Sequence, residues 1–142
     1  MIGVVLATHA ELGRALIAAM EMIVGGQEQV AALSLQVADQ LEQTAVRLHE
    51  AVAAADGGDG VLVLTDMLGG TPSNLCLALI GGSRAVEVVS GVNLPMLLKA
   101  VQSRRELDLR ETAVQAKKAG RGAVVLASEA LSGPAAAGGD RP

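Results

Sequence analysis

At 142 residues, of which 51% are hydrophobic, the chain is long enough for one domain with a sizeable core, and disorder over most of its length is excluded. The net charge of −4 and the absence of Phe, Tyr and Trp argue against nucleic-acid binding, because neither a basic stripe nor stacking side chains are present. A single cysteine, Cys76, excludes an internal disulfide and a multi-cysteine metal site.

No targeting or membrane-spanning segment is recognisable. Met1 leads directly into a strand-like segment without a basic leader, and no apolar run approaches the roughly 18 residues of a membrane span. We therefore expect a soluble cytoplasmic protein.

The first half of the chain alternates between apolar runs and helical patterns. Residues 2–7 (IGVVLA) predict a buried strand, and residues 10–24 have apolar side chains at helical spacing up to the Gly25-Gly26 break. Residues 30–35 predict a weaker strand. Asp39 and Glu42 resemble a capping box, which predicts a helix that runs to the next glycine pair, Gly57-Gly58.

The second half continues the alternation. An unbroken run at residues 61–64 predicts a strand buried on both faces, and a helix capped by Thr71 with Pro72 at its first position follows the Gly69-Gly70 turn. The remaining elements are predicted as a strand at 85–89, a turn at 91–93, a helix at 94–102 with Pro95 in its first turn, a helix at 109–119 capped by Asp108, a short strand at 122–126, and a disordered tail from Ser132.

This alternation predicts an α/β fold with a mostly parallel sheet and helices on both faces. Binding sites in such sheets lie beyond the carboxyl ends of the strands. Three loops should therefore meet there: Thr8-His9, residues 66–73 and residues 90–93.

His9 and Asp66 are the candidate catalytic pair, since each follows a predicted strand. A carboxylate bound to one ring nitrogen fixes the tautomer and leaves the other nitrogen as a nucleophile. Asp66 alone also fits a turn-capping residue or a metal-holding acid, although the phosphate loop of nucleotide-binding proteins is absent.

The residues around this pair are candidate phosphate ligands. The start of the helix after Asp66 offers free backbone N–H groups and the positive end of the helix dipole. We assign phosphate binding to Thr8, Gly69, Gly70, Thr71 and Ser73, while the hydroxyls of Thr71 and Ser73 equally fit simple helix caps.

Other chemically active side chains have structural interpretations. We expect His49 on a solvated helix face, Cys76 as an inert small hydrophobe, and Arg104-Arg105 and Lys117-Lys118 as solvated charge pairs. Three methionines are expected to fill the core: Met20, Met22 and Met96.

Three motifs resemble the mannose-class IIA components of the bacterial phosphotransferase system. They are IGVVLATH at residues 2–9, DMLGGTPSN at 66–74 and GVNLPML at 91–97, in the same order as in the family. The resemblance spans about residues 1–130 and leaves residues 131–142 as a flexible tail.

The resemblance implies a phosphocarrier. His9 would accept a phosphoryl group from the phosphocarrier protein HPr, with Asp66 orienting and stabilising it, and pass the group to a IIB component for sugar uptake. Neither a metal nor another cofactor is implied, and the membrane would be reached only through a permease partner. The alternative is a regulatory phosphoprotein whose phospho-His9 state controls a partner.

The resemblance also implies a three-layer fold and an assembly. The sheet order would be 2-1-3-4 with an antiparallel fifth edge strand, exchanged between the subunits of a homodimer, and residues 122–126 fit that strand. No IIB domain follows within the sequence, which leaves the sugar, and the choice between transport and regulation, open.

Overall fold

The protein is built around a four-stranded sheet in which neighbouring strands run parallel, in the order β2-β1-β3-β4. The structure, a computed structural model, describes residues 1–36, 40–67 and 70–132, and of residues 70–73 only the backbone. The strands are β1 Gly3–His9, β2 Val30–Leu35, β3 Val61–Thr65 and β4 Val86–Ser90. The predicted parallel sheet and its 2-1-3-4 order are confirmed.

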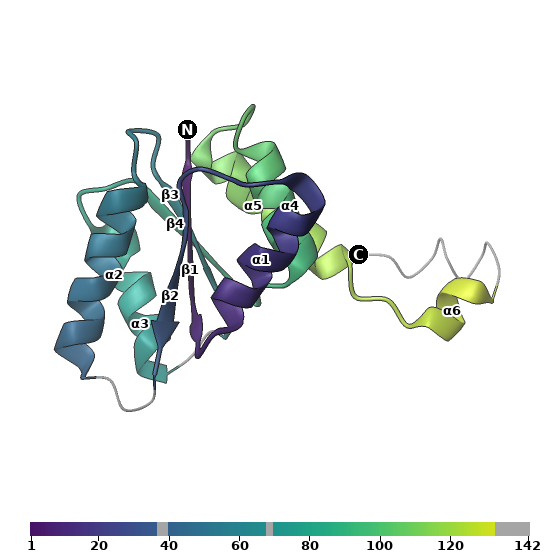
Figure 1. Ribbon diagram of the computed structural model, residues 1–142, viewed down its shortest axis with the longest axis horizontal. Coiled ribbons are helices and arrows are strands. Elements are labelled where there is room, and N and C mark those ends of the chain that lie inside the picture. Colours follow the sequence, from purple (N-terminus) through teal and green to yellow (C-terminus); the bar gives the residue numbers. More distant parts are fainter. Residues whose placement is uncertain (37–39, 68–69, 133–142) are drawn as a thin grey trace.

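Helices cover both faces of the sheet, giving three layers (Figure 1). One face carries α1 Leu12–Val24, α4 Leu94–Ser103 and α5 Leu109–Gly122. The other carries α2 Leu41–Ala55 and α3 Gly70–Ala78, which is followed by the short 3-10 helix Leu79–Gly81. The last described helix, α6 Ala127–Leu131, lies away from this body.

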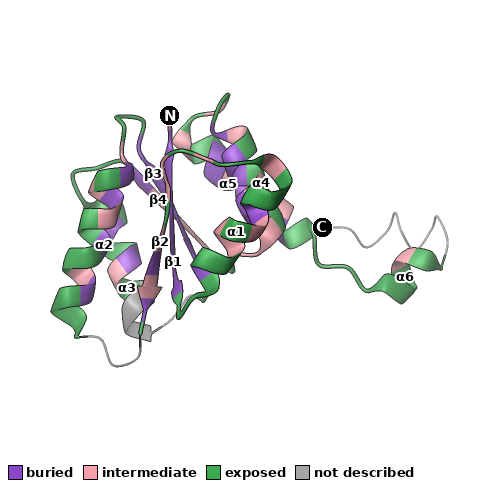
Figure 2. Ribbon diagram, in the orientation of Figure 1, coloured by how far each residue is buried: buried purple, intermediate pink, exposed green. Residues whose placement is uncertain are grey.

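The central strands are buried on both sides, as their unbroken apolar runs predict (Figure 2). Alternate side chains of β1 enter opposite clusters, so that Val4 and Leu6 pack towards α1, α4 and α5 while Val5 and Ala7 pack towards α2 and α3. Because the chain has no aromatic residue, both clusters consist of aliphatic side chains, methionine and Cys76.

Two helix starts agree with the sequence. The Asp108 carboxylate accepts the Glu111 N–H at 2.8 Å and caps α5 as expected, and Pro95 lies in the first turn of α4. The start of α2 was expected at Asp39, which lies outside the described residues.

The expected strand at residues 122–126 is not present as a strand in the single chain. Gly122 is the last residue of α5 and Ala123 follows it in a turn, after which residues 124–126 form neither a helix nor a strand. Val124 is 78% exposed, and the segment leads away from the body to α6 (Figure 1). A valine-rich run forms a strand only where a sheet edge supplies its hydrogen bonds. Val124 lines a cavity beside the edge strand β4, but the segment does not join the sheet of its own chain.

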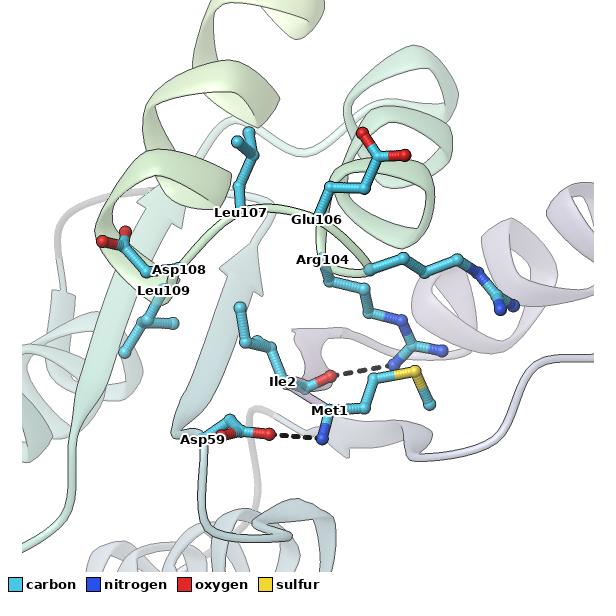
Figure 3. A pocket seen from close by; sticks show the side chains of 9 residues that line it. Met1, Ile2, Asp59, Arg104, Glu106, Leu107, Asp108 and Leu109 are labelled. Atoms are coloured by element: carbon cyan, nitrogen blue, oxygen red, sulfur yellow. Dashed lines mark hydrogen bonds and ion pairs between the residues drawn. The ribbon is translucent and has the colours of Figure 1, made fainter.

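The expectation that Arg104 belongs to a solvated charge pair is wrong, because Arg104 is only 3% exposed. It lies at the amino-terminal end of the sheet, opposite His9, and donates to the Ile2 carbonyl at 3.0 Å and the Glu28 carbonyl at 2.7 Å. Burial lowers the pKa of its guanidinium group. Figure 3 shows this contact beside an open cavity of about 660 Å³ that Arg104 lines together with Met1 and Asp59. Arg104 therefore ties α4 to the start of β1 and to the loop before β2.

Candidate functional site

The candidate site lies at the carboxyl end of the sheet, where β1 and β3 finish side by side. Ala7 pairs with Thr65 in the parallel register, so the residues that follow, His9 on β1 and Asp66 after β3, meet. The His9 side chain is 51% exposed and the Asp66 side chain 15% exposed. The pairing predicted from the two strand ends is confirmed as a contact, while its catalytic role stays a prediction.

A single carboxylate oxygen holds His9 at two points. Asp66 Oδ2 accepts the His9 backbone N–H at 3.0 Å and lies 3.0 Å from ring Nδ1. In a neutral imidazole this contact assigns the proton to Nδ1, since a carboxylate only accepts. The lone pair then resides on Nε2, the nitrogen that Asp66 does not engage.

The carboxylate is kept in its anionic form. Burial raises the pKa of Asp66, but the hydrogen bonds from the His9 backbone and ring outweigh burial, so that the pKa lies below its ordinary value. The other oxygen, Oδ1, accepts the Met67 backbone N–H at 3.1 Å. The Asp66 carboxylate thus holds a negative charge beside the His9 ring, and this charge stabilises any positive charge that develops on the ring.

The loop after β4 joins the same end of the sheet, as expected. The Gly91 and Val92 N–H groups both donate to the Thr65 carbonyl at 2.9 Å. Gly91 has φ +92°, a conformation that glycine adopts without a steric cost. This turn holds the segment that leads to α4 against the residue that precedes Asp66.

The Thr8 side chain was expected to bind phosphate, but it is buried between β1 and α1. The side chain is fully buried, and Oγ1 accepts the Gly13 N–H at 2.7 Å. A side chain with no exposed surface does not reach a ligand at His9. Thr8 lies on the same face of β1 as Val4 and Leu6, which pack towards α1, α4 and α5.

The remaining candidate phosphate ligands surround the start of α3. Gly69 lies outside the described residues. Gly70, Thr71 and Ser73 lie in the first turns of α3, which begins at Gly70, one residue before the expected cap; their side chains are not described. Their phosphate contacts therefore stay predictions.

Two residues near His9 were missed from the sequence. Ala10 has φ +48°, unusual for a residue other than glycine, and its N–H donates to the Leu35 carbonyl at 3.2 Å. Gly13 lies in the first turn of α1, where an added Cβ would be 2.9 Å from Thr8 Oγ1. A glycine inside a helical pattern was an available signal of close packing, whereas nothing in the sequence marked Ala10.

The other reactive side chains lie away from this pair. His49 is exposed on α2, and Cys76 is buried on α3, where burial raises the pKa of the thiol to about 11; both expectations are confirmed. Met20 and Met96 are buried as expected, but Met22 is 90% exposed, so its assignment to the core was wrong. Across the described parts of the chain, no helix has the length and apolar character to cross a membrane.

Comparison with known proteins identifies the family of the chain. The family model described as "PTS system fructose IIA component" matches residues 3–117. The mannose-specific EIIAB component of the phosphotransferase system of Escherichia coli K12 is 31% identical over 103 residues, which cover 72% of this chain but 32% of that protein. The chain thus spans about a third of the length of that relative.

A shorter relative and a solved structure match over most of their own length. The fructose-specific EIIA component of Bacillus subtilis is 29% identical over 111 residues, 78% of this chain and 76% of that protein. The crystal structure of a phosphotransferase system EIIA component from Streptococcus agalactiae superposes with a TM-score of 0.82 at 28% identity, covering 90% of this chain and 98% of that one. The chain belongs to the mannose- and fructose-type IIA family of the bacterial phosphotransferase system.

Proposed function

We propose that the protein is a phosphocarrier that accepts a phosphoryl group from phospho-HPr on Nε2 of His9. The observation that carries the proposal is the contact between Asp66 Oδ2 and His9 Nδ1 at 3.0 Å, which directs the lone pair of a half-exposed ring to Nε2. Membership of the IIA family supports the same assignment, since these components are phosphotransferase-type proteins.

The transfer balances without a metal or another cofactor. The Nε2 lone pair of His9 attacks phosphorus, and the P–N bond to the donor's histidine breaks, so that its electron pair returns to the donor. The His9 ring keeps its Nδ1 proton and becomes cationic, and Asp66 stabilises that charge. The phosphoryl oxygens would meet Gly69 and, in the first turns of α3, Gly70, Thr71 and Ser73, because the backbone N–H groups and dipole of a helix start favour an anion.

The acceptor distinguishes two versions of this function. In the first, a IIB component takes the phosphoryl group for sugar uptake, as the name of the E. coli EIIAB relative suggests. In the second, phospho-His9 controls a regulatory partner. Both versions place the protein in the cytoplasm with HPr, and the first reaches the membrane only through a permease.

Radiolabelled phospho-HPr tests the proposal. We expect the wild-type chain and a His49→Ala control to take up label, and His9→Ala to take up none while keeping its fold. Labelling of His9→Ala at the wild-type level would overturn the assignment. Adding a IIB protein then separates the versions: label that moves to IIB supports transport, and label that stays supports the regulatory role.

We further propose that the protein is a homodimer in which residues 122–126 complete the partner's sheet. Three exposed side chains support the exchange: Val124 at 78%, Val125 at 56% and Leu126 at 62%. A cavity of about 440 Å³ lies beside the edge strand β4, lined by Val88 and Val89, by the C-terminal end of α5 and by Val124 of the same chain. Covering this edge would remove unpaired backbone groups from solvent.

Light scattering at micromolar concentration tests the dimer. The expected mass is twice that of one chain, and truncation after Gly120 should abolish it and leave an aggregation-prone protein. A monomer mass for the full chain would contradict the exchange and leave the histidine chemistry unaffected.

A further inference from the structure

The hydroxyl of Thr8 joins the strand that carries the nucleophile to the helix that follows it. Thr8 precedes His9 in β1 and is fully buried, and its Oγ1 accepts the Gly13 N–H of the first turn of α1 at 2.7 Å. The side chain of Glu11, the N-cap residue of this helix, makes no capping hydrogen bond. The Thr8 hydroxyl therefore satisfies an N–H group that the helix itself leaves without a partner.

The contact between strand and helix is close at this point. A Cβ added to Gly13 would lie 2.9 Å from Thr8 Oγ1, 3.2 Å from the Leu6 Cβ and 3.4 Å from the Ala32 Cβ. Only glycine lets the helix approach β1 so closely without moving a neighbour. The hydrogen bond and the missing side chain together fix the distance between α1 and the sheet.

The link from His9 to α1 is short and conformationally constrained. Ala10 and Glu11 separate the two elements, and Ala10 adopts φ +48°, a left-handed conformation in which a residue with a Cβ is strained. The Ala10 N–H is held by the Leu35 carbonyl and the His9 N–H by Asp66 Oδ2. A strained conformation persists only where the surroundings hold it. The hydrogen bond from the Gly13 N–H to Thr8 Oγ1 holds the α1 end of this link in place.

We propose that Thr8 is a positioning residue for phosphoryl transfer: its hydroxyl anchors α1 so that the strained turn at Ala10 keeps the His9 ring on Asp66 Oδ2, with Nε2 facing outwards. The inference rests on the proposed phosphocarrier function and gives a role there to a residue that touches neither donor nor phosphoryl group. A hydroxyl that served packing alone would affect stability but not the orientation of the ring.

The test compares Thr8→Val, which removes the hydroxyl at nearly constant volume, with Thr8→Ser, which retains it. Thr112→Val is the matched control, since Thr112 is equally buried and its hydroxyl donates to the carbonyl of Leu107, which lies in the loop before α5. Two experiments are made. The kinetics of transfer from phospho-HPr give kcat and KM. The ring ¹⁵N shifts of His9 give its tautomer at about pH 8, where a typical imidazole is neutral.

We expect Thr8→Val to lower kcat by about tenfold or more with little change in KM, because small misplacements of a reacting group cost rate rather than binding. The Nδ1–H fraction of His9 should fall in the same variant. Thr8→Ser should restore both quantities, and Thr112→Val should change neither. If Thr8→Val does not fold, Thr8→Ala makes the same comparison.

Two results would overturn the proposal. One is a wild-type kcat and tautomer in the folded variants without the hydroxyl. The other is an equal loss of kcat in Thr112→Val, which would show an effect of stability alone. If the wild-type chain took no phosphoryl group at all, the proposed function would fail, and the tautomer measurement would still decide the role of Thr8.

Discussion

Replacing Asp66 with asparagine isolates the charge of the candidate pair. Asparagine keeps the size of the side chain and an oxygen that can accept the Nδ1 proton, but it removes the negative charge that faces the ring. In the proposed transfer the His9 ring becomes cationic only as it attacks, so the lost attraction raises the barrier rather than weakening the starting state. We expect Asp66→Asn to remain folded and to transfer slowly.

The size of the effect follows from the separation of the two groups. Unit charges 3.0 Å apart, the distance from His9 Nδ1 to Asp66 Oδ2, attract by about 1.4 kcal/mol in bulk water and about 5.5 kcal/mol at an effective dielectric constant near 20. The ring is 51% exposed, which places the interaction in the lower part of this range, at about 2 to 3 kcal/mol. The transfer rate should therefore fall by about 30- to 160-fold.

Single-turnover transfer from saturating phospho-HPr, stopped by rapid quenching, measures this rate. Asp59→Asn is the control, because Asp59 is an exposed carboxylate that pairs with the amino terminus at the opposite end of the sheet. A wild-type rate for Asp66→Asn would refute the reasoning and reduce Asp66 to a turn residue.

The same variant has a pH signature. Because the pKa of Asp66 is lowered in the folded chain, its carboxylate stabilises the fold above the unfolded value of about 3.9, and this contribution is lost as the pH falls through the lower folded value. Urea unfolding should show wild type more stable than Asp66→Asn at neutral pH, with the difference shrinking below about pH 4 and vanishing once the pH is below the folded pKa of Asp66. A difference that persisted in acid would point to lost packing instead of lost charge.

Two further predictions concern residues outside the site. Arg104→Met should lower the free energy of unfolding by about 2 to 4 kcal/mol, since it leaves buried carbonyl groups without their charged donor. Substitution of the exposed neighbour, Arg105→Met, should change this free energy little. Equal effects of the two substitutions in urea titrations would contradict the buried role of Arg104. Cys76, with its pKa raised to about 11, should react with a thiol reagent at neutral pH only when the protein unfolds, and rapid labelling of the native chain would contradict its burial.

The sequence predicted the elements whose patterns are local. The apolar runs of β1 and β3 and the Asp108 cap of α5 depend on neighbours a few residues away, and they were found within one or two residues of their observed bounds. His9 and Asp66 could be paired because the rule that governs parallel sheets brings strand ends together.

The errors concern residues whose partners lie far away in the chain. Arg104 looked like one half of a surface charge pair, but its acceptor Ile2 is 102 residues distant. Val124 and its neighbours have the composition of a strand, yet a strand also needs an edge to pair with, and pairing with the sheet of a partner subunit stays a proposal. Thr8 lies in a strand that is buried on both faces, so alternation did not show whether its side chain reaches the site.

The central claim is that Nε2 of His9 carries the phosphoryl group. The most direct measurement is NMR of the chain labelled with ¹⁵N-histidine, before and after reaction with phospho-HPr, in which the ring nitrogens of His9 and His49 are resolved. We predict that phosphorylation shifts Nε2 of His9 and leaves His49 unchanged. A phosphoryl group on Nδ1 of His9, or on His49, would contradict the claim.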